Sequence, residues 1–128
     1  MTSKHLLLID DEPTIQEVVQ VGLELDTDWI ISLASSGSEG VSKAEHEQPD
    51  AILLDVMMPG MDGIETFERL KKHKLLHSTP VIFLTAKAQS LQRRQLSQIG
   101  ARGIISKPFN SLQLAGQISK LLGWQLKS

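Results

Sequence analysis

Short apolar segments alternate with amphipathic segments along the chain, and this alternation limits the possible folds more than any other feature of the sequence. The apolar segments are residues 6–9, 29–33, 51–54, 81–84 and 104–105. Helical patterns follow them over residues 13–25, 36–47, 62–74, 87–98 and 110–122. Short apolar segments bounded by turn residues are typical of buried strands. The alternation predicts an α/β fold, with a parallel, doubly wound sheet that helices cover on both faces.

Local signals mark where several of these helices begin and end. Three expected helix starts carry a capping residue followed three positions later by Glu or Gln: Ser36 with Glu39, Asp62 with Glu65, and Asn110 with Gln113. Such pairs satisfy backbone N–H groups that the first helical turn leaves free. Gly123 is a natural end for the last helix.

The length and composition fit a single domain. The chain has 128 residues, of which 41% are hydrophobic, and its net charge is -2, so direct binding to nucleic acid or to an anionic membrane is not expected. The sequence contains no cysteine, which excludes disulfides and thiol chemistry and is compatible with a cytoplasmic protein. The apolar segment 6–9 is too short for a signal peptide or a membrane span. We therefore expect residues 1–128 to be one domain without an attached output domain.

Polar residues follow four of the predicted strands at the point where each strand ends. Asp10 and Asp11 follow the first strand, Asp55 the third, Thr85 the fourth and Lys107 the fifth. The carboxyl ends of parallel strands form one edge of a sheet, where ligands of open α/β sheets bind. If the first and third strands are neighbours, these side chains converge at that edge.

The acidic residues of this edge predict a magnesium site. Crowded carboxylates raise one another's pKa, and a hard divalent cation relieves that repulsion. Mg²⁺ prefers oxygen ligands, usually one or two carboxylates together with waters and phosphate oxygens. We expect Asp11 and Asp55 to bind it directly, Asp10 to act through water, and the main-chain carbonyl of Met57 to contribute. No histidine or cysteine lies nearby in the sequence, which argues against zinc.

The same residues match the requirements of a phosphoryl group on Asp55. A carboxylate can act as a nucleophile and form an aspartyl phosphate. The transferred group carries its charge on three oxygens, and catalysis is mostly positioning and charge stabilisation. The metal could take one oxygen, the Lys107 ammonium group a second, and the Thr85 hydroxyl the third.

Each feature also has a simpler structural interpretation. Asp10 and Asp11 could merely cap the following helix, and Thr85 could do the same. Lys107 could be a solvated surface lysine in an ordinary turn, although a cis bond before Pro108 would redirect it inward. The prediction of a site therefore depends on several features falling at the strand ends of one sheet.

The sequence resembles the receiver domain of two-component response regulators over essentially its whole length. The matching motifs are Leu-Ile-Asp-Asp-Glu-Pro at residues 8–13, Leu-Leu-Asp-Val-Met-Met-Pro-Gly-Met-Asp-Gly at 53–63, Phe-Leu-Thr-Ala at 83–86 and Ser-Lys-Pro-Phe at 106–109. The resemblance implies a five-stranded, flavodoxin-like sheet of order 2-1-3-4-5. It also implies that a histidine kinase phosphorylates Asp55 in a Mg²⁺-dependent reaction and that Thr85 and Lys107 sense the phosphoryl group.

Signal output should then pass to a downstream protein or a phosphotransfer protein. The resemblance implies that the face formed by the fourth helix, fifth strand and fifth helix rearranges, and the same face offers a surface for a homodimer. One departure affects this expectation: Ile104 stands where the family usually carries Tyr or Phe. A branched aliphatic side chain cannot rotate a large ring between interior and surface. We therefore predict output through loop or helix movement, or through a changed oligomer, without an aromatic switch.

Two positions near the site should determine how long a phosphoryl group stays on Asp55. Met57 and Lys87 stand where the family tunes access of the hydrolytic water, and neither is an evident general base, so self-dephosphorylation should be slow.

A Mg²⁺ phosphatase with an aspartyl intermediate is a competing function, but that class normally carries an acid at the position of Met57. A phosphorylation-independent scaffold is another, although such a protein is expected to lose an acid, the acceptor or the lysine.

Overall fold

The computed structural model describes residues 3–86 and 90–126, which form five strands and five helices. The strands are β1 (His5–Ile9), β2 (Ile30–Ala34), β3 (Ala51–Asp55), β4 (Val81–Thr85) and β5 (Gly103–Ser106). The helices are α1 (Pro13–Asp26), α2 (Gly37–Glu47), α3 (Gly63–Lys72), α4 (Ser90–Gln98) and α5 (Ser111–Leu122). None of the helices in the described residues is long and apolar enough to cross a lipid bilayer.

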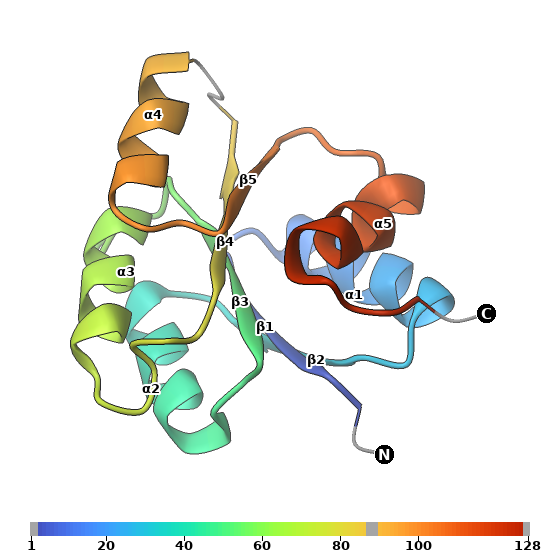
Figure 1. The fold of residues 1–128 in the computed structure, drawn as a ribbon, viewed down its shortest axis with the longest axis horizontal. Coiled ribbons are helices and arrows are strands. Elements are labelled where there is room, and N and C mark those ends of the chain that lie inside the picture. Colours follow the sequence, from blue (N-terminus) through green and yellow to red (C-terminus); the bar gives the residue numbers. More distant parts are fainter. Residues whose placement is uncertain (1–2, 87–89, 127–128) are drawn as a thin grey trace.

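All strand pairs are parallel, and the sheet order is β2-β1-β3-β4-β5. Helices α2, α3 and α4 cover one face of the sheet, and α1 and α5 cover the other (Figure 1). This arrangement confirms the flavodoxin-like doubly wound fold expected from the sequence.

The strands are apolar at successive positions because both faces of the sheet are covered. In β1, Leu7 and Ile9 belong to the core beneath α2, α3 and α4, whereas Leu6 and Leu8 belong to the core beneath α1 and α5. Successive side chains of a strand point to opposite faces, so a strand covered on both sides needs a continuous apolar run. Every residue of β3 and β4 is accordingly buried.

The predicted capping residues are confirmed at the starts of α2, α3 and α5, with one small difference at α5. The Ser36 side chain accepts from Glu39 N, and the Asp62 side chain accepts from Glu65 N. At α5, Asn110 Oδ1 accepts from the N–H of Leu112 at 2.9 Å, so its side chain caps one residue earlier than the capping-box pattern implied. The predicted first turn of the fourth helix, residues 87–89, lies outside the described residues.

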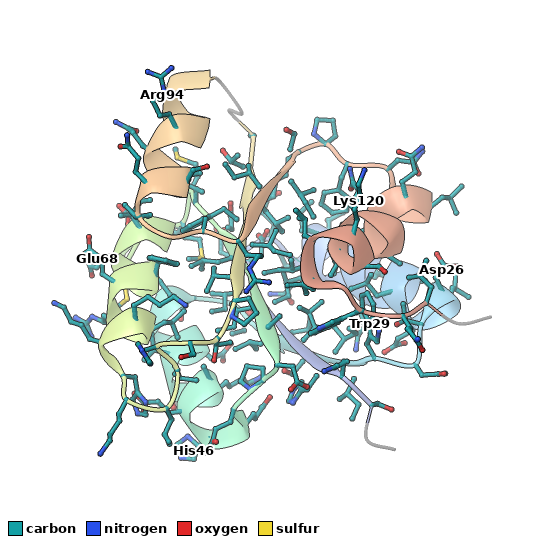
Figure 2. The ribbon with its side chains drawn as sticks, in the orientation of Figure 1. Asp26, Trp29, His46, Glu68, Arg94 and Lys120 are labelled. Carbon is teal, nitrogen blue, oxygen red and sulfur yellow. The ribbon has the colours of Figure 1, made fainter. Side chains whose placement is uncertain are left out.

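The second strand begins at Ile30, one residue later than predicted, because Trp29 has other contacts. Its backbone N–H donates to Thr27 Oγ1, and its buried ring packs edge-on against Trp124, with ring centroids 4.9 Å apart. The indole N–H of Trp29 donates to the Gln125 carbonyl oxygen at 3.2 Å. Figure 2 shows Trp29 beside the chain that follows α5. The two tryptophans thus fasten the segment after α5 to the amino-terminal end of the sheet, opposite the strand ends that carry the polar residues.

Candidate functional site

The register of the sheet places the polar residues at one edge. Ile9 pairs with Leu54, so Asp10, the next residue along, lies beside Asp55 at the end of β3. Thr85 pairs with Ser106, and the backbone N–H of Lys107 donates to the Thr85 carbonyl oxygen at 2.8 Å. Because all strands run in the same direction, their carboxyl ends meet at this edge.

Three carboxylates form an acidic cluster at this edge. Asp10, Asp11 and Asp55 each offer one oxygen, and these oxygens lie within 4.8 Å of one another. Asp10 and Asp55 are buried, whereas Asp11 is half-buried. Buried carboxylates require compensation by a cation or by hydrogen bonds.

Lys107 supplies part of that compensation and is not a solvated surface lysine. Its Nζ donates to Asp10 Oδ2 at 2.8 Å and lies 3.4 Å from both Asp55 Oδ1 and Glu12 Oε1. Only 10% of the lysine side chain is exposed. The peptide bond between Lys107 and Pro108 is cis.

The surrounding charges shift the pKa of Lys107. Burial alone lowers the pKa of this amine, but the hydrogen bond and charge of Asp10, with the charges of Asp55 and Glu12, outweigh burial and raise it above its ordinary value. Lys107 is therefore firmly cationic at neutral pH. It can act as a fixed positive charge toward an anion at this edge.

Asp55 has one oxygen bound and one oxygen free. Its Oδ1 accepts from the Met57 N–H at 3.3 Å, whereas its buried Oδ2 has no hydrogen-bond partner among the described residues. Burial and the neighbouring charge of Asp10 raise the pKa of Asp55 from 3.8 to about 6, against the opposing effects of Lys107 and the Met57 N–H. A buried polar atom without a partner is rare in native proteins and commonly marks a site of binding or catalysis.

The donor set fits a hard divalent cation. Among the described residues the group consists of three carboxylates, with no thiol or imidazole ligand, and such an oxygen donor set is the one that Mg²⁺ accepts. The free Oδ2 of Asp55 is an oxygen that a cation or an electrophile could use. The Met57 carbonyl oxygen as an additional ligand stays a prediction.

Asp10 also has a structural function. Asp10 Oδ1 accepts from the N–H of Glu12 at 2.9 Å, and the Asp10 carbonyl oxygen accepts from Gln16 Nε2 at 2.7 Å. Asp10 therefore orders the start of α1 while its other carboxylate oxygen binds Lys107. Thr85 is fully buried beside Lys107, and its contact with a phosphoryl oxygen stays a prediction.

A glycine determines the path of the loop after Asp55. Gly63 donates its N–H to the Val56 carbonyl oxygen at 3.0 Å. A Cβ atom at Gly63 would lie 2.3 Å from the Asp55 carbonyl oxygen and 2.6 Å from Val56 Cα, distances that no side chain tolerates. The absence of a side chain at Gly63 therefore lets the start of α3 pack directly against the end of β3.

The β3–α3 loop borders an open pocket next to Asp55. This pocket has a volume of about 550 Å³ and is lined by Val56, Met57, Met58, Pro59, Gly60, Asp62 and Ile64. Met57 is exposed, so its side chain borders solvent beside Asp55. Lys87, the other residue expected to influence hydrolysis, lies outside the described residues.

Glu12 was not among the residues predicted for the site. The structure brings its carboxylate to Lys107, with Oε1 3.4 Å from Nζ. The only local signal was its position directly after the two aspartates. Its partner is 95 positions away and is evident only in the folded chain.

Comparisons with known proteins agree with this arrangement. The model of the response regulator receiver domain family matches residues 6–119. The chain is 37% identical over 123 residues to "Response regulator Rre1" of Synechocystis, covering 96% of this chain and 53% of that protein. It is 37% identical over 120 residues to the alkaline phosphatase synthesis transcriptional regulatory protein PhoP of Bacillus subtilis, covering 94% of this chain and 49% of that protein. The chain thus spans about half the length of these curated relatives.

Solved structures show the same similarity. The chemotaxis protein CheY4 of Vibrio cholerae superposes with a TM-score of 0.88 at 27% identity, covering 94% of this chain and all of that chain (100%). A CheY-like receiver domain protein from Methanospirillum hungatei gives a TM-score of 0.83 at 30% identity, covering 95% of each chain. On the family match and the fold together, the chain belongs to the response regulator receiver domain family, whose members are signalling switches of two-component systems.

Proposed function

We propose that residues 1–128 act as one receiver domain that accepts a phosphoryl group on Asp55 from a histidine kinase in a Mg²⁺-dependent reaction. The observation that carries this proposal is the environment of Asp55. Its buried Oδ2 has no hydrogen-bond partner within the described part of the chain, while Lys107 and two further carboxylates surround the same side chain. No other acidic side chain in residues 3–86 and 90–126 combines a buried, unpartnered oxygen with a neighbouring cation.

Asp55 acts as the nucleophile. One carboxylate oxygen forms a bond to phosphorus while the P–N bond of the phosphohistidine donor breaks, and the imidazole nitrogen leaves with the electron pair. Nucleophilic attack requires the ionised carboxylate. The pKa of about 6 leaves Asp55 mostly ionised at neutral pH.

Neighbouring side chains stabilise the charge that is transferred. Lys107, which already lies 3.4 Å from Asp55 Oδ1, binds one phosphoryl oxygen as a point charge. Thr85 donates its hydroxyl group to another. Asp10, Asp11 and Asp55 would hold Mg²⁺, which would offset the negative charge of the carboxylates and of the phosphoryl oxygens.

The proposed partners are a histidine kinase and a downstream protein or phosphotransfer protein. The net charge of -2 gives no support for direct binding to nucleic acid, and a cytoplasmic location suits the absence of cysteine.

Output would pass through the α4–β5–α5 face, where homodimers would also form. Ile104 on β5 is half-buried against the core beneath α2, α3 and α4, so output is proposed to use movement of α4 or of the loops without an aromatic switch.

Intact mass spectrometry tests the phosphoacceptor directly. The protein is mixed with Mg²⁺ and a small phosphodonor, and Asp55→Asn is compared with the matched variant Asp26→Asn, which changes an aspartate at the far end of α1. A single phosphate adduct in the wild type and Asp26→Asn, and none in Asp55→Asn, supports the proposal. Rapid consumption of donor without an adduct would favour a phosphatase, and no reaction would favour a phosphorylation-independent scaffold.

A further inference from the structure

Glu12 occupies a capping position but does not cap. It is the N-cap residue of α1, yet its side chain makes no capping hydrogen bond, and its own N–H is bound by Asp10 Oδ1. The Glu12 carboxylate instead extends to Lys107, with Oε1 3.4 Å from Nζ. The local structure of the helix start therefore does not explain the direction of this side chain.

Glu12 is the solvent-side member of a group of three acids around one ammonium group. Asp10 and Asp55 are buried, whereas 57% of the Glu12 side chain is exposed. A lysine ammonium group has three N–H donors, which three carboxylates can share. In the described structure Lys107 Nζ donates to Asp10 and Glu12 and lies 3.4 Å from Asp55 Oδ1.

These three contacts compete with any anion attached to Asp55. A phosphoryl oxygen that binds Lys107 must take an N–H donor that these carboxylates now share. The contact with Glu12 is long and exposed to water, so it is the contact that is lost most readily. The free energy of that contact therefore belongs to the unphosphorylated state and opposes phosphorylation.

We propose that Glu12 is a positioning residue that holds Lys107 in its resting place and thereby weakens the binding of a phosphoryl group at Asp55. This inference rests on the proposed function, since it concerns the same acceptor. It makes Glu12 a determinant of how much of the protein is in the activated state.

Binding of fluoroberyllate, a tetrahedral phosphoryl analogue, tests whether Glu12 weakens the binding of an anion at Asp55. In the presence of Mg²⁺, Glu12→Gln should lower the dissociation constant for fluoroberyllate about two- to fivefold, which is the range of an exposed ion pair. Glu17→Gln removes the same charge from an exposed position of α1 and should leave the constant unchanged. An unchanged constant in Glu12→Gln overturns the inference.

A double-mutant cycle tests whether Glu12 acts through Lys107. In a Lys107→Met background, Glu12→Gln should no longer change the affinity for fluoroberyllate, because the group that it positions is missing. The same two- to fivefold change in both backgrounds would show a direct effect of the Glu12 charge and would overturn the positioning role.

A measurement without metal or anion separates this inference from the proposed function. The ¹H–¹⁵N resonance of the Lys107 ammonium group should shift in Glu12→Gln and stay in place in Glu17→Gln. Identical Lys107 resonances in the two variants would show that Glu12 does not contact Lys107. If fluoroberyllate instead binds wild type and Asp55→Asn equally, the phosphoacceptor assignment fails, while the resonance still reports on the position of Lys107.

Discussion

The ammonium group of Lys107 lies 2.8 Å from Asp10 Oδ2, although the two residues are 97 positions apart in the sequence. They follow β5 and β1, which are not neighbours, because β3 and β4 lie between them in the sheet. The ion pair therefore reaches across the ends of two strands and passes beside Asp55, to which Lys107 is also close. A cation is in this way held over the proposed acceptor before any phosphoryl group arrives.

Removing this cation should destabilise the metal-free protein. Lys107→Met leaves Asp10 and Asp55 buried without their counter-charge, and we expect the free energy of unfolding to fall by about 2–3 kcal/mol at pH 7.5. Urea denaturation measures this change. Lys120→Met, at an exposed lysine of α5 (Figure 2), should change stability by less than about 0.5 kcal/mol. Equal stability of both variants would show that the buried pair contributes little.

Asp55→Asn should stabilise the metal-free protein at neutral pH. The pKa of Asp55 is about 6 in the folded protein against 3.8 as the ordinary value, so the folded state binds the proton more tightly than the unfolded chain. The contribution of Asp55 to the free energy of unfolding is highest below pH 3.8 and falls as the pH rises through 6. Removing the charge should therefore add about 2–3 kcal/mol above pH 7 and little at pH 4.

Thermal unfolding of Asp55→Asn and wild type between pH 4 and pH 8 measures this difference. Mg²⁺ should stabilise the wild type more than the variant, since the variant lacks one carboxylate of the cluster. Asp26→Asn serves as the control for the loss of an aspartate away from the acidic cluster. A constant difference between Asp55→Asn and wild type across this range would contradict the raised pKa.

Two glycine substitutions should have opposite effects on stability. In Gly63→Ala the new methyl group would lie 2.3 Å from the Asp55 carbonyl oxygen, so the end of β3 must shift and both stability and phosphorylation should fall. In Gly116→Ala, within α5, the methyl group meets nothing within 4 Å, so the variant should gain about 0.5–1 kcal/mol from helix propensity. Urea denaturation and the mass assay check both variants. A stable, normally phosphorylated Gly63→Ala protein would refute the close approach.

Trp124→Ala should weaken the fold without changing the site. The variant loses the edge-on contact with Trp29 and the contact of Lys4 with the Trp124 ring, whose centroid lies 5.8 Å from Nζ. Together these contacts should contribute about 1–3 kcal/mol. Calorimetric titration with Mg²⁺ should give the same affinity as the wild type, because these residues lie at the opposite end of the sheet from the acidic cluster. A large loss of Mg²⁺ affinity would contradict this separation.

The phosphoryl group should persist for minutes or longer. Met57, exposed beside Asp55, offers neither an acid nor a base to activate a hydrolytic water. Decay of the phosphoprotein, followed by intact mass after removal of the donor, measures the lifetime. Decay within seconds would show that another group activates the water.

The sequence alone determined the elements and the edge where the site lies. Segments such as 51–54 and 81–84 are apolar at every position, and buried strands of this kind are recognisable because the signal is local. The parallel direction of the strands then places Asp10, Asp55 and Lys107 at a common edge. Local signals are weaker at the ends of elements. The second strand therefore begins one residue later than predicted, because Trp29 contacts Thr27 and Trp124.

Only the tertiary structure decided which groups are paired and which is free. The contacts of Lys107 with Asp10 and Glu12 join residues 97 and 95 positions apart, and no periodicity in the sequence encodes such distances. The unpartnered Oδ2 of Asp55 and its raised pKa likewise follow from burial and from charges on other strands. Electrostatic effects depend on distance in space, whereas sequence patterns report neighbours along the chain.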